Sequence, residues 1–75
     1  MNIIIAGDGK VGSMLTRQLS SEGYDVTVID ANPSVLSASV ERYDVIGIHG
    51  NCASMEILLE AGVKSADLLI AATSA

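Results

Sequence analysis

The sequence predicts an α/β fold, in which a doubly wound parallel sheet carries helices on both faces. Three observations lead to it. Short apolar runs recur along the chain, with room for one helix between each pair. The first run leads directly into the glycine-rich stretch of residues 7–12, and the second ends in Asp30. Hydrophobic residues make up 49% of the chain but aromatic ones only 3%, so an aliphatic core is expected, as in a sheet covered on both faces.

Four apolar runs are the predicted strands. They lack the polar alternation of a half-exposed sheet, and three of them are rich in β-branched residues. We therefore expect all of them to be buried on both faces. They comprise residues 3–6, 26–29, 45–48 and 68–72.

The first intervening segment predicts a helix that begins near Lys10 and stops at Gly23, a favourable residue just past a helix end. Its apolar residues recur at helical spacing, so they form one stripe expected to face the sheet. This stripe comprises Val11, Met14, Leu15 and Leu19.

The next two helices carry recognisable starts. Asn32 followed by Pro33 predicts an N-cap and a first helical residue, and Ser54 predicts the N-cap of a third helix that ends at Gly62. The expected inner residues are Val35, Leu36 and Val40 in the second helix, and Met55, Leu58 and Leu59 in the third.

Strands and helices alternate, and right-handed crossovers then give a parallel sheet in the spatial order 3-2-1-4. A complete fold of this kind continues through two more strands, so we expect residues 1–75 to be the N-terminal part of a longer domain, truncated after its fourth strand. A chain this short buries only about 60% of its unfolded surface. We therefore expect it to belong to something larger or to an oligomer.

The glycine-rich stretch has the spacing G-x-G-x-x-G between a predicted strand and a predicted helix, which is the dinucleotide-binding fingerprint of Rossmann-type folds. Gly7 permits the tight turn, and Gly9 lets the backbone approach a pyrophosphate. Gly12 lets the helix pack close to the strand. The free N–H groups at the helix start then face the anion.

Asp30 follows Gly12 by eighteen residues, at the end of the second strand. A carboxylate there accepts hydrogen bonds from a ribose diol and repels a 2′-phosphate. The next residue is Ala31 rather than Arg, so the pattern favours NAD over NADP. The alternative is that Asp30 only caps the turn before Asn32.

Composition excludes several classes of function. The net charge is −5 with few basic residues, so no basic patch for nucleic acid is expected. Cys52 is the single cysteine, which fits a reducing, cytoplasmic compartment. No apolar run approaches the ~20 residues that cross a bilayer, so no direct membrane insertion is expected.

An enzyme is the first alternative, as the cofactor-binding half of an NAD-dependent dehydrogenase. A dehydrogenase needs a proton-transfer residue and a substrate pocket. His49 stands alone at the end of a predicted strand and favours a structural or solvent-facing role, and Cys52 favours a partly buried thiol. A second alternative is a dimerisation module whose glycine loop holds no ligand.

The chain as a whole resembles the TrkA N-terminal domain, also called the RCK or KTN domain, of bacterial potassium-uptake regulators. The stretch from Leu58 to Gly62 that leads into residues 66–73 distinguishes this family from ordinary dehydrogenases. The resemblance rests on residues 3–12, 24–30, 50–51, 58–63 and 66–73.

The resemblance implies a non-enzymatic regulatory subunit that binds NAD or NADH and, in some members, ATP or ADP. It implies a homo-oligomer, a dimer or larger, beneath a membrane potassium-translocating subunit. Such a protein is cytoplasmic and peripheral to the inner face of the membrane. Movement driven by the ligand then gates the flux of potassium.

Transferred by position, the resemblance puts phosphates on the glycine loop, ribose at Asp30, adenine beside Asn51 and the middle or far half of the cofactor at Thr73. Asp8 departs from the family pattern, because a carboxylate near a pyrophosphate is unfavourable unless it points away or pairs, and Lys10 could offset it. Asn51 also departs, since the family often has Asp there. The predicted binding residues are Gly7, Asp8, Gly9, Lys10, Val11, Gly12, Asp30, Ala31, Asn51, Cys52 and Thr73.

Overall fold

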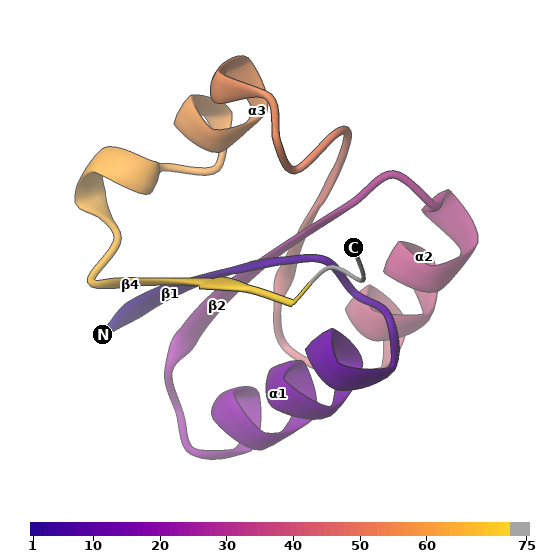
Figure 1. The fold of residues 1–75 in the computed structure, drawn as a ribbon. Helices are drawn as coiled ribbons and strands as arrows, with labels where there is room; N and C mark the ends of the chain where they lie inside the picture. Colours follow the sequence, from indigo (N-terminus) through magenta and orange to yellow (C-terminus); the bar gives the residue numbers. More distant parts are fainter. Residues whose placement is uncertain (73–75) are drawn as a thin grey trace.

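The computed structural model describes residues 1–72 and places a parallel sheet between two layers of helices (Figure 1). The strands lie in the order β3-β2-β1-β4, which confirms the predicted 3-2-1-4 topology. Helices α1 and α2 cover one face, while α3 and a short 3-10 helix, η1, lie on the other. The strands are β1 (Asn2–Ala6), β2 (Asp25–Asp30), β3 (Ile46–His49) and β4 (Leu68–Ala71), and the helices are α1 (Lys10–Ser21), α2 (Pro33–Arg42), α3 (Met55–Glu60) and η1 (Val63–Ser65).

The core lies between the sheet and the layer of α1 and α2. Alternate residues of β1 and β2 point into it, because side chains of a strand alternate between faces. Leu15 and Leu19 of α1 pack against this cluster. The buried cluster comprises Ile3, Ile5, Val26, Val28 and Leu36.

Burial on both faces holds for the central strands and not for the outer ones. β1 is buried from Ile3 to its end, whereas no residue of β3 or β4 is fully buried. Ile46 is 64% exposed and Leu69 is 45% exposed. The prediction of full burial is therefore wrong for β3 and β4, because within residues 1–72 each lies at an edge of the sheet beside a single neighbouring strand.

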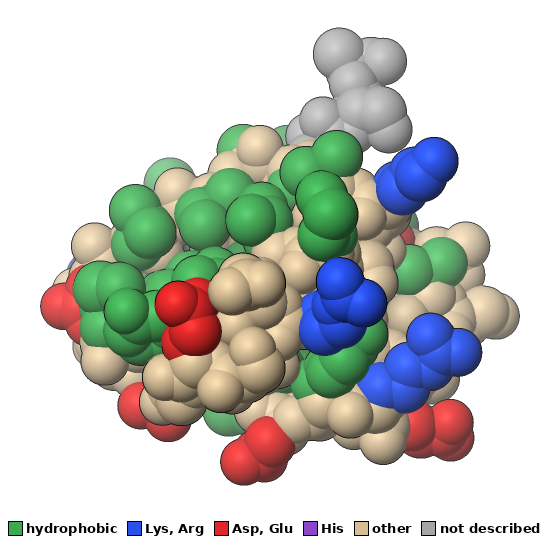
Figure 2. All heavy atoms as spheres, turned by 90° about the horizontal axis from the view of Figure 1, so that it is seen from below, with side chains coloured by type: hydrophobic (Ala, Val, Ile, Leu, Met, Phe, Trp, Pro, Cys, Tyr) green, Lys and Arg blue, Asp and Glu red, His purple; other side chains and the backbone are tan. Residues whose placement is uncertain are grey.

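Helix α1 packs through a narrower surface than the predicted stripe. Leu15 and Leu19 contact the core as expected, but Val11 and Met14 are 55% and 56% exposed. The residues that α1 buries are small, Gly12 and Thr16, so the helix approaches the sheet closely on that line. Hydrophobic side chains consequently remain uncovered on the face that α1 helps to form (Figure 2).

The capping predictions hold for both later helices. The Asn32 side chain accepts hydrogen bonds from the N–H groups of Ser34 and Val35, and the Ser54 hydroxyl accepts one from Ile57. Gly23 and Gly62 have φ of 88° and 87°, the left-handed conformation that ends a helix and favours glycine.

The side chains predicted to face the sheet are only partly correct for α2 and α3. In α2, Leu36 is buried but Val40 is 44% exposed. Helix α3 buries no residue, and Met55 and Leu59 face outward at 64% and 45% exposure. The predicted inward orientation of these two side chains is wrong, because α3 has only six residues and lies over the sheet rather than in a closed layer. None of the helices within residues 1–72 has the length and apolar character needed to cross a bilayer.

A substitution at Gly12 tests how closely α1 packs against the turn after β1. A Cβ built on Gly12 would lie 1.9 Å from the Gly7 carbonyl oxygen, whereas a Cβ on Gly9 would meet no atom within 4 Å. We expect Gly12→Ala to lower the free energy of unfolding by about 1–3 kcal/mol or more, because backbone atoms must shift. Urea denaturation followed by circular dichroism measures it. Gly9→Ala is the matched control, and equal stabilities of the two variants would contradict the packing argument.

The exposed edge of β4 predicts that the isolated chain associates with itself in solution. Leu68 and Leu69 are each 45% exposed, and one edge of their strand has no partner strand among residues 1–72; such an edge is a template for pairing with another chain. We expect light scattering across a concentration series to show a mass above the 7.7 kDa of one chain. Leu69→Lys should reduce this association, because a charge blunts an edge strand, whereas Met55→Lys on α3 should not. A concentration-independent 7.7 kDa species would contradict the expectation.

Candidate functional site

The candidate site lies at the carboxyl ends of the strands, which share one edge in a parallel sheet. The loops after β1, β2 and β3 meet there and enclose a cleft of about 250 Å³. Ligands of doubly wound sheets bind at this edge. The cleft is lined by Gly7, Gly9, Asp30, Ala31, Asn51, Cys52 and Ala72.

The glycine-rich loop has the geometry that its sequence predicts. Gly7 has φ of 109°, a conformation that side chains disfavour, and its N–H donates to the carbonyl of Ile29 at 2.8 Å. Gly9 is the N-cap of α1, and the space where its Cβ would lie is open. The loop thus leaves an open approach to its own backbone at Gly9.

The start of α1 is available to an anion. No side chain caps it, and its first turn holds no acidic residue. The first N–H groups of a helix have no partner inside the helix, and the helix dipole adds positive potential at that end. This end of α1 therefore has the features of a phosphate site.

Asp30 is the one charged residue that lines the cleft within the described chain. Its Oδ2 accepts a hydrogen bond from the Asp8 N–H and its Oδ1 accepts one from the Asn32 N–H, both at 2.7 Å. The bond to Asn32 is the turn-capping role that the sequence left open. A carboxylate has about four acceptor positions, so Asp30 keeps capacity to accept ribose hydroxyls as well.

Asp8 points away from the cleft and into the protein. It is 1% exposed, and its Oδ2 accepts a hydrogen bond from the Ser39 hydroxyl of α2 at 2.6 Å. Its Oδ1 is buried with no partner among residues 1–72. Burial raises the pKa of Asp8, the Ser39 bond opposes this, and the negative charge of Asp30 raises it further. Lys10, the suggested counter-charge, is exposed, and Ser39 takes the partner role instead.

The predicted binding residues fall into two groups. Those that line the cleft are Gly7, Gly9, Asp30, Ala31, Asn51 and Cys52. Those that adjoin it without lining it are Asp8, Lys10, Val11 and Gly12. Thr73 lies outside the described residues. Direct contact between this second group and a ligand stays a prediction.

Sequence reasoning missed Ser39. The signal was a small polar residue three positions after Leu36, on the inner face of α2, where an apolar residue is the usual choice. Ser39 is 3% exposed, and a buried hydroxyl requires a hydrogen-bond partner.

The remaining chemically interesting side chains have structural surroundings. The His49 ring nitrogen Nε2 lies 3.0 Å from the Ala31 carbonyl oxygen, which joins the ends of β2 and β3. Cys52 is half-buried with a free thiol. Over residues 1–72, no group of three His, Cys, Asp or Glu side chains is arranged to hold a metal ion.

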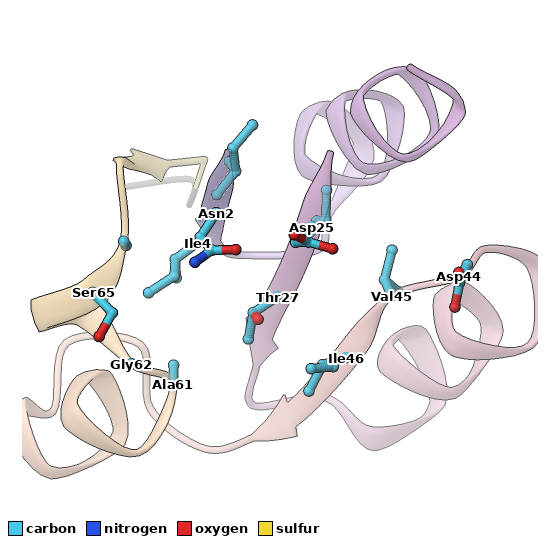
Figure 3. Close-up of a pocket in the computed structure, with 13 residues that line it drawn as sticks. Asn2, Ile4, Asp25, Thr27, Asp44, Val45, Ile46, Ala61, Gly62 and Ser65 are labelled. Atoms are coloured by element: carbon cyan, nitrogen blue, oxygen red, sulfur yellow. The ribbon is translucent and has the colours of Figure 1, made fainter. Parts of the chain in front are cut away.

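A larger hollow of about 470 Å³ lies at the opposite ends of the strands (Figure 3). Ile4, Thr27 and Ile46 form its floor on the sheet, and Ala61, Gly62 and Ser65 lie across from them. Its charged residues are Asp25 and Asp44, and the glycine loop and the start of α1 are remote from it. The hollow exists because α3 and η1 cover that face of the sheet only thinly. Since it lacks the glycine loop and the helix start, the smaller cleft is the candidate site.

Comparison with known proteins supports the assignment. The sequence model of the TrkA-N domain matches residues 3–75. The Trk system potassium uptake protein TrkA of Azorhizobium caulinodans is 37% identical over 73 residues, which are 97% of this chain and 16% of that protein. The TrkA homolog of Archaeoglobus fulgidus is 41% identical over 73 residues, with the same two coverages of 97% and 16%.

A solved structure is similar to this chain in both fold and sequence. The Kef CTD of Shewanella denitrificans in its AMP-bound form has a TM-score of 0.85 and 33% sequence identity, and the match covers 100% of this chain and 44% of that one. The chain thus spans a minor part of the proteins it matches. It belongs to the TrkA-N (RCK) family.

Proposed function

We propose that this domain binds NAD or NADH in the cleft, with ATP or ADP as alternative ligands, and thereby regulates potassium transport. The observation that carries the proposal is the open space at Gly9, which faces the uncapped start of α1 beside the Asp30 carboxylate. The backbone of the loop and α1 would hold phosphates, and Asp30 would hold a ribose. Asn51 would lie beside the adenine.

The size of the cleft favours recognition of the adenosine half of the ligand. Pockets for drug-sized molecules have volumes of about 300–1,000 Å³, and this cleft is smaller, at about 250 Å³. An adenine mononucleotide unit is common to NAD, AMP, ADP and ATP, and the similar Kef domain is in an AMP-bound form. The far half of a dinucleotide would extend past Ala72, toward the predicted contact at Thr73.

We further propose that the domain acts as a homo-oligomer on the cytoplasmic side of the membrane, in contact with a potassium-translocating subunit. A ligand changes such an assembly only if it binds one arrangement more tightly than another. The cleft is suited to this, because its lining comes from the loops after β1, β2 and β3 and from Ala72 after β4. A nucleotide that spans them would favour one relative placement of these loops.

The Asp30 carboxylate should make the cleft select NAD(H) over NADP(H). A 2′-phosphate beside it would meet a like charge and lose a hydrogen bond, at a cost of about 1–3 kcal/mol in binding free energy. Calorimetric titration of NADH and NADPH measures the difference. Asp30→Ala should narrow it, and NADPH binding as tight as NADH binding would refute the assignment of Asp30.

Gly9 should be essential for binding and dispensable for folding. Gly9→Val places a branched side chain in the open space at the start of α1, where the pyrophosphate is proposed to lie, so nucleotide binding should be lost. Circular dichroism should be unchanged, because a Cβ at this position meets no atom of the described chain within 4 Å. Gly9→Ala, with a smaller group, should weaken binding less. If a folded Gly9→Val protein still bound nucleotide, the proposed position of the phosphates at Gly9 would be wrong.

A further inference from the structure

The side chain of Asp8 ties the glycine loop to helix α2. Asp8 lies between Gly7 and Gly9, which both line the cleft, yet its carboxylate turns inward to Ser39. Both partners are almost fully buried, at 1% and 3% exposure, and their oxygens are 2.6 Å apart. A short, buried hydrogen bond to a carboxylate is among the stronger ones in proteins.

This bond closes a ring of contacts around the acidic end of β2. The Asp8 N–H donates to one oxygen of Asp30, and the Asn32 N–H donates to the other. Asn32 in turn caps α2, the helix that carries Ser39. The glycine loop, the end of β2 and α2 are therefore connected through Asp8 by both its main chain and its side chain.

We infer that Asp8 is a positioning residue: through Ser39 it holds the turn from Gly7 to Gly9 against α2, and its charge sets how tightly the cleft binds a nucleotide. This inference rests on the proposed nucleotide binding. It gives α2, which does not line the cleft, a direct mechanical link to the proposed seat of the phosphates.

The charge of Asp8 should affect nucleotide binding because Asp8 is next to the proposed phosphate site. Asp8 stands between Gly7 and Gly9 in the chain, and adjacent α-carbons are about 3.8 Å apart, so an anion bound to the backbone of these glycines would lie within one residue of Asp8. Screening is weak for a buried group, and like charges at such a distance disfavour ionisation. A phosphate bound there would disfavour ionisation of Asp8 and so raise its pKa, in the same direction as burial does.

The other ionisable groups around Asp8 are few. Asp30, at the end of β2, adds a negative charge that also raises the Asp8 pKa, while α2 presents the neutral Ser39 hydroxyl. Lys10 at the start of α1 is exposed, and His49 at the end of β3 is hydrogen-bonded to Ala31. His49 is the single histidine of the sequence, so it requires its own control.

The sign of the effect is fixed by linkage. Because the ligand raises the Asp8 pKa, the complex takes up protons as it forms. Affinity then increases as the pH falls from the Asp8 pKa in the complex to its pKa in the free protein, and is constant below that range. One unit of difference between these two pKa values corresponds to a change of about tenfold in Kd.

The experiment is calorimetric titration of the whole protein with NAD⁺ from about pH 4, near the ordinary pKa of a carboxyl group, to about pH 8, in buffers of different ionisation enthalpy, which reports proton uptake directly. The unmodified protein should take up protons on binding. Asp8→Asn keeps an oxygen for Ser39 but cannot ionise, so uptake should vanish and Kd should lose its dependence on this titration. His49→Gln should retain the uptake.

Ser39→Ala tests the tether itself. It removes the bond that lowers the Asp8 pKa, so the pH profile should move to higher pH, and the freed loop should bind NAD⁺ more weakly at every pH. Ser37→Ala, at an exposed position of the same helix, is the matched control and should match the unmodified protein. A role confined to stability would lower the melting temperature without moving the pH profile.

The outcomes separate the two hypotheses. If the protein binds NAD⁺ without proton uptake, or if Ser39→Ala behaves like Ser37→Ala, the inference about Asp8 is overturned while nucleotide binding stands. If the unmodified protein binds neither NAD(H) nor ATP or ADP, the proposed function fails first. Should Asp8→Asn not fold, proton uptake by the unmodified protein and the paired serine variants still decide the question.

Discussion

The close approach of α1 to the turn after β1 is the constraint on which the carboxyl end of the sheet depends. The helix buries Gly12 and Thr16, and Gly12 lies against the Gly7 carbonyl with no room for a side chain. The Thr16 hydroxyl donates to the Gly12 carbonyl at 2.8 Å, which satisfies this polar group inside the contact. A bulkier residue on this line would push the helix outward and carry its free N–H groups away from the cleft.

The chemistry of the cleft is therefore mainly that of the backbone. The chain has a net charge of −5, and the one charged side chain in the described lining is the acidic Asp30. Attraction for phosphates must come from oriented N–H groups and the dipole of α1. The two hydrogen bonds from Asp8 and Asn32 hold the Asp30 carboxylate in one orientation, so a ribose in the proposed position would meet a group that is already oriented.

Local sequence signals predicted most of this arrangement. The order of elements, the caps Asn32 and Ser54, and the glycine-terminated helices depend on neighbouring residues alone, and the structure confirms them. The meeting of Gly9, Asp30 and Asn51 in one cleft followed from the parallel topology, because that topology brings their loops to one edge.

Properties set by distant contacts were less predictable. Met14 and Met55 lie at positions where helical spacing suggests an inner face, but which side is covered depends on how each helix rotates against the sheet. The pairing of Asp8 with Ser39 joins residues 31 positions apart, and no local pattern encodes it. Edge exposure of β3 and β4 likewise depends on what lies beside each strand and not on its own residues.

The thin layer of α3 and η1 has a consequence for the energetics of the fold. Neither element buries a residue, so opening this layer exposes little apolar surface and costs much less than unfolding the β1–β2 core. Asn51 and Cys52, just before α3, line the cleft together with Gly7 and Asp30 from the buried side. A ligand that contacts both parts of the cleft stabilises the less stable part, the α3 layer, by its binding free energy. In the proposed complex, local unfolding of the α3 layer, which amide hydrogen exchange measures, would be coupled to ligand binding.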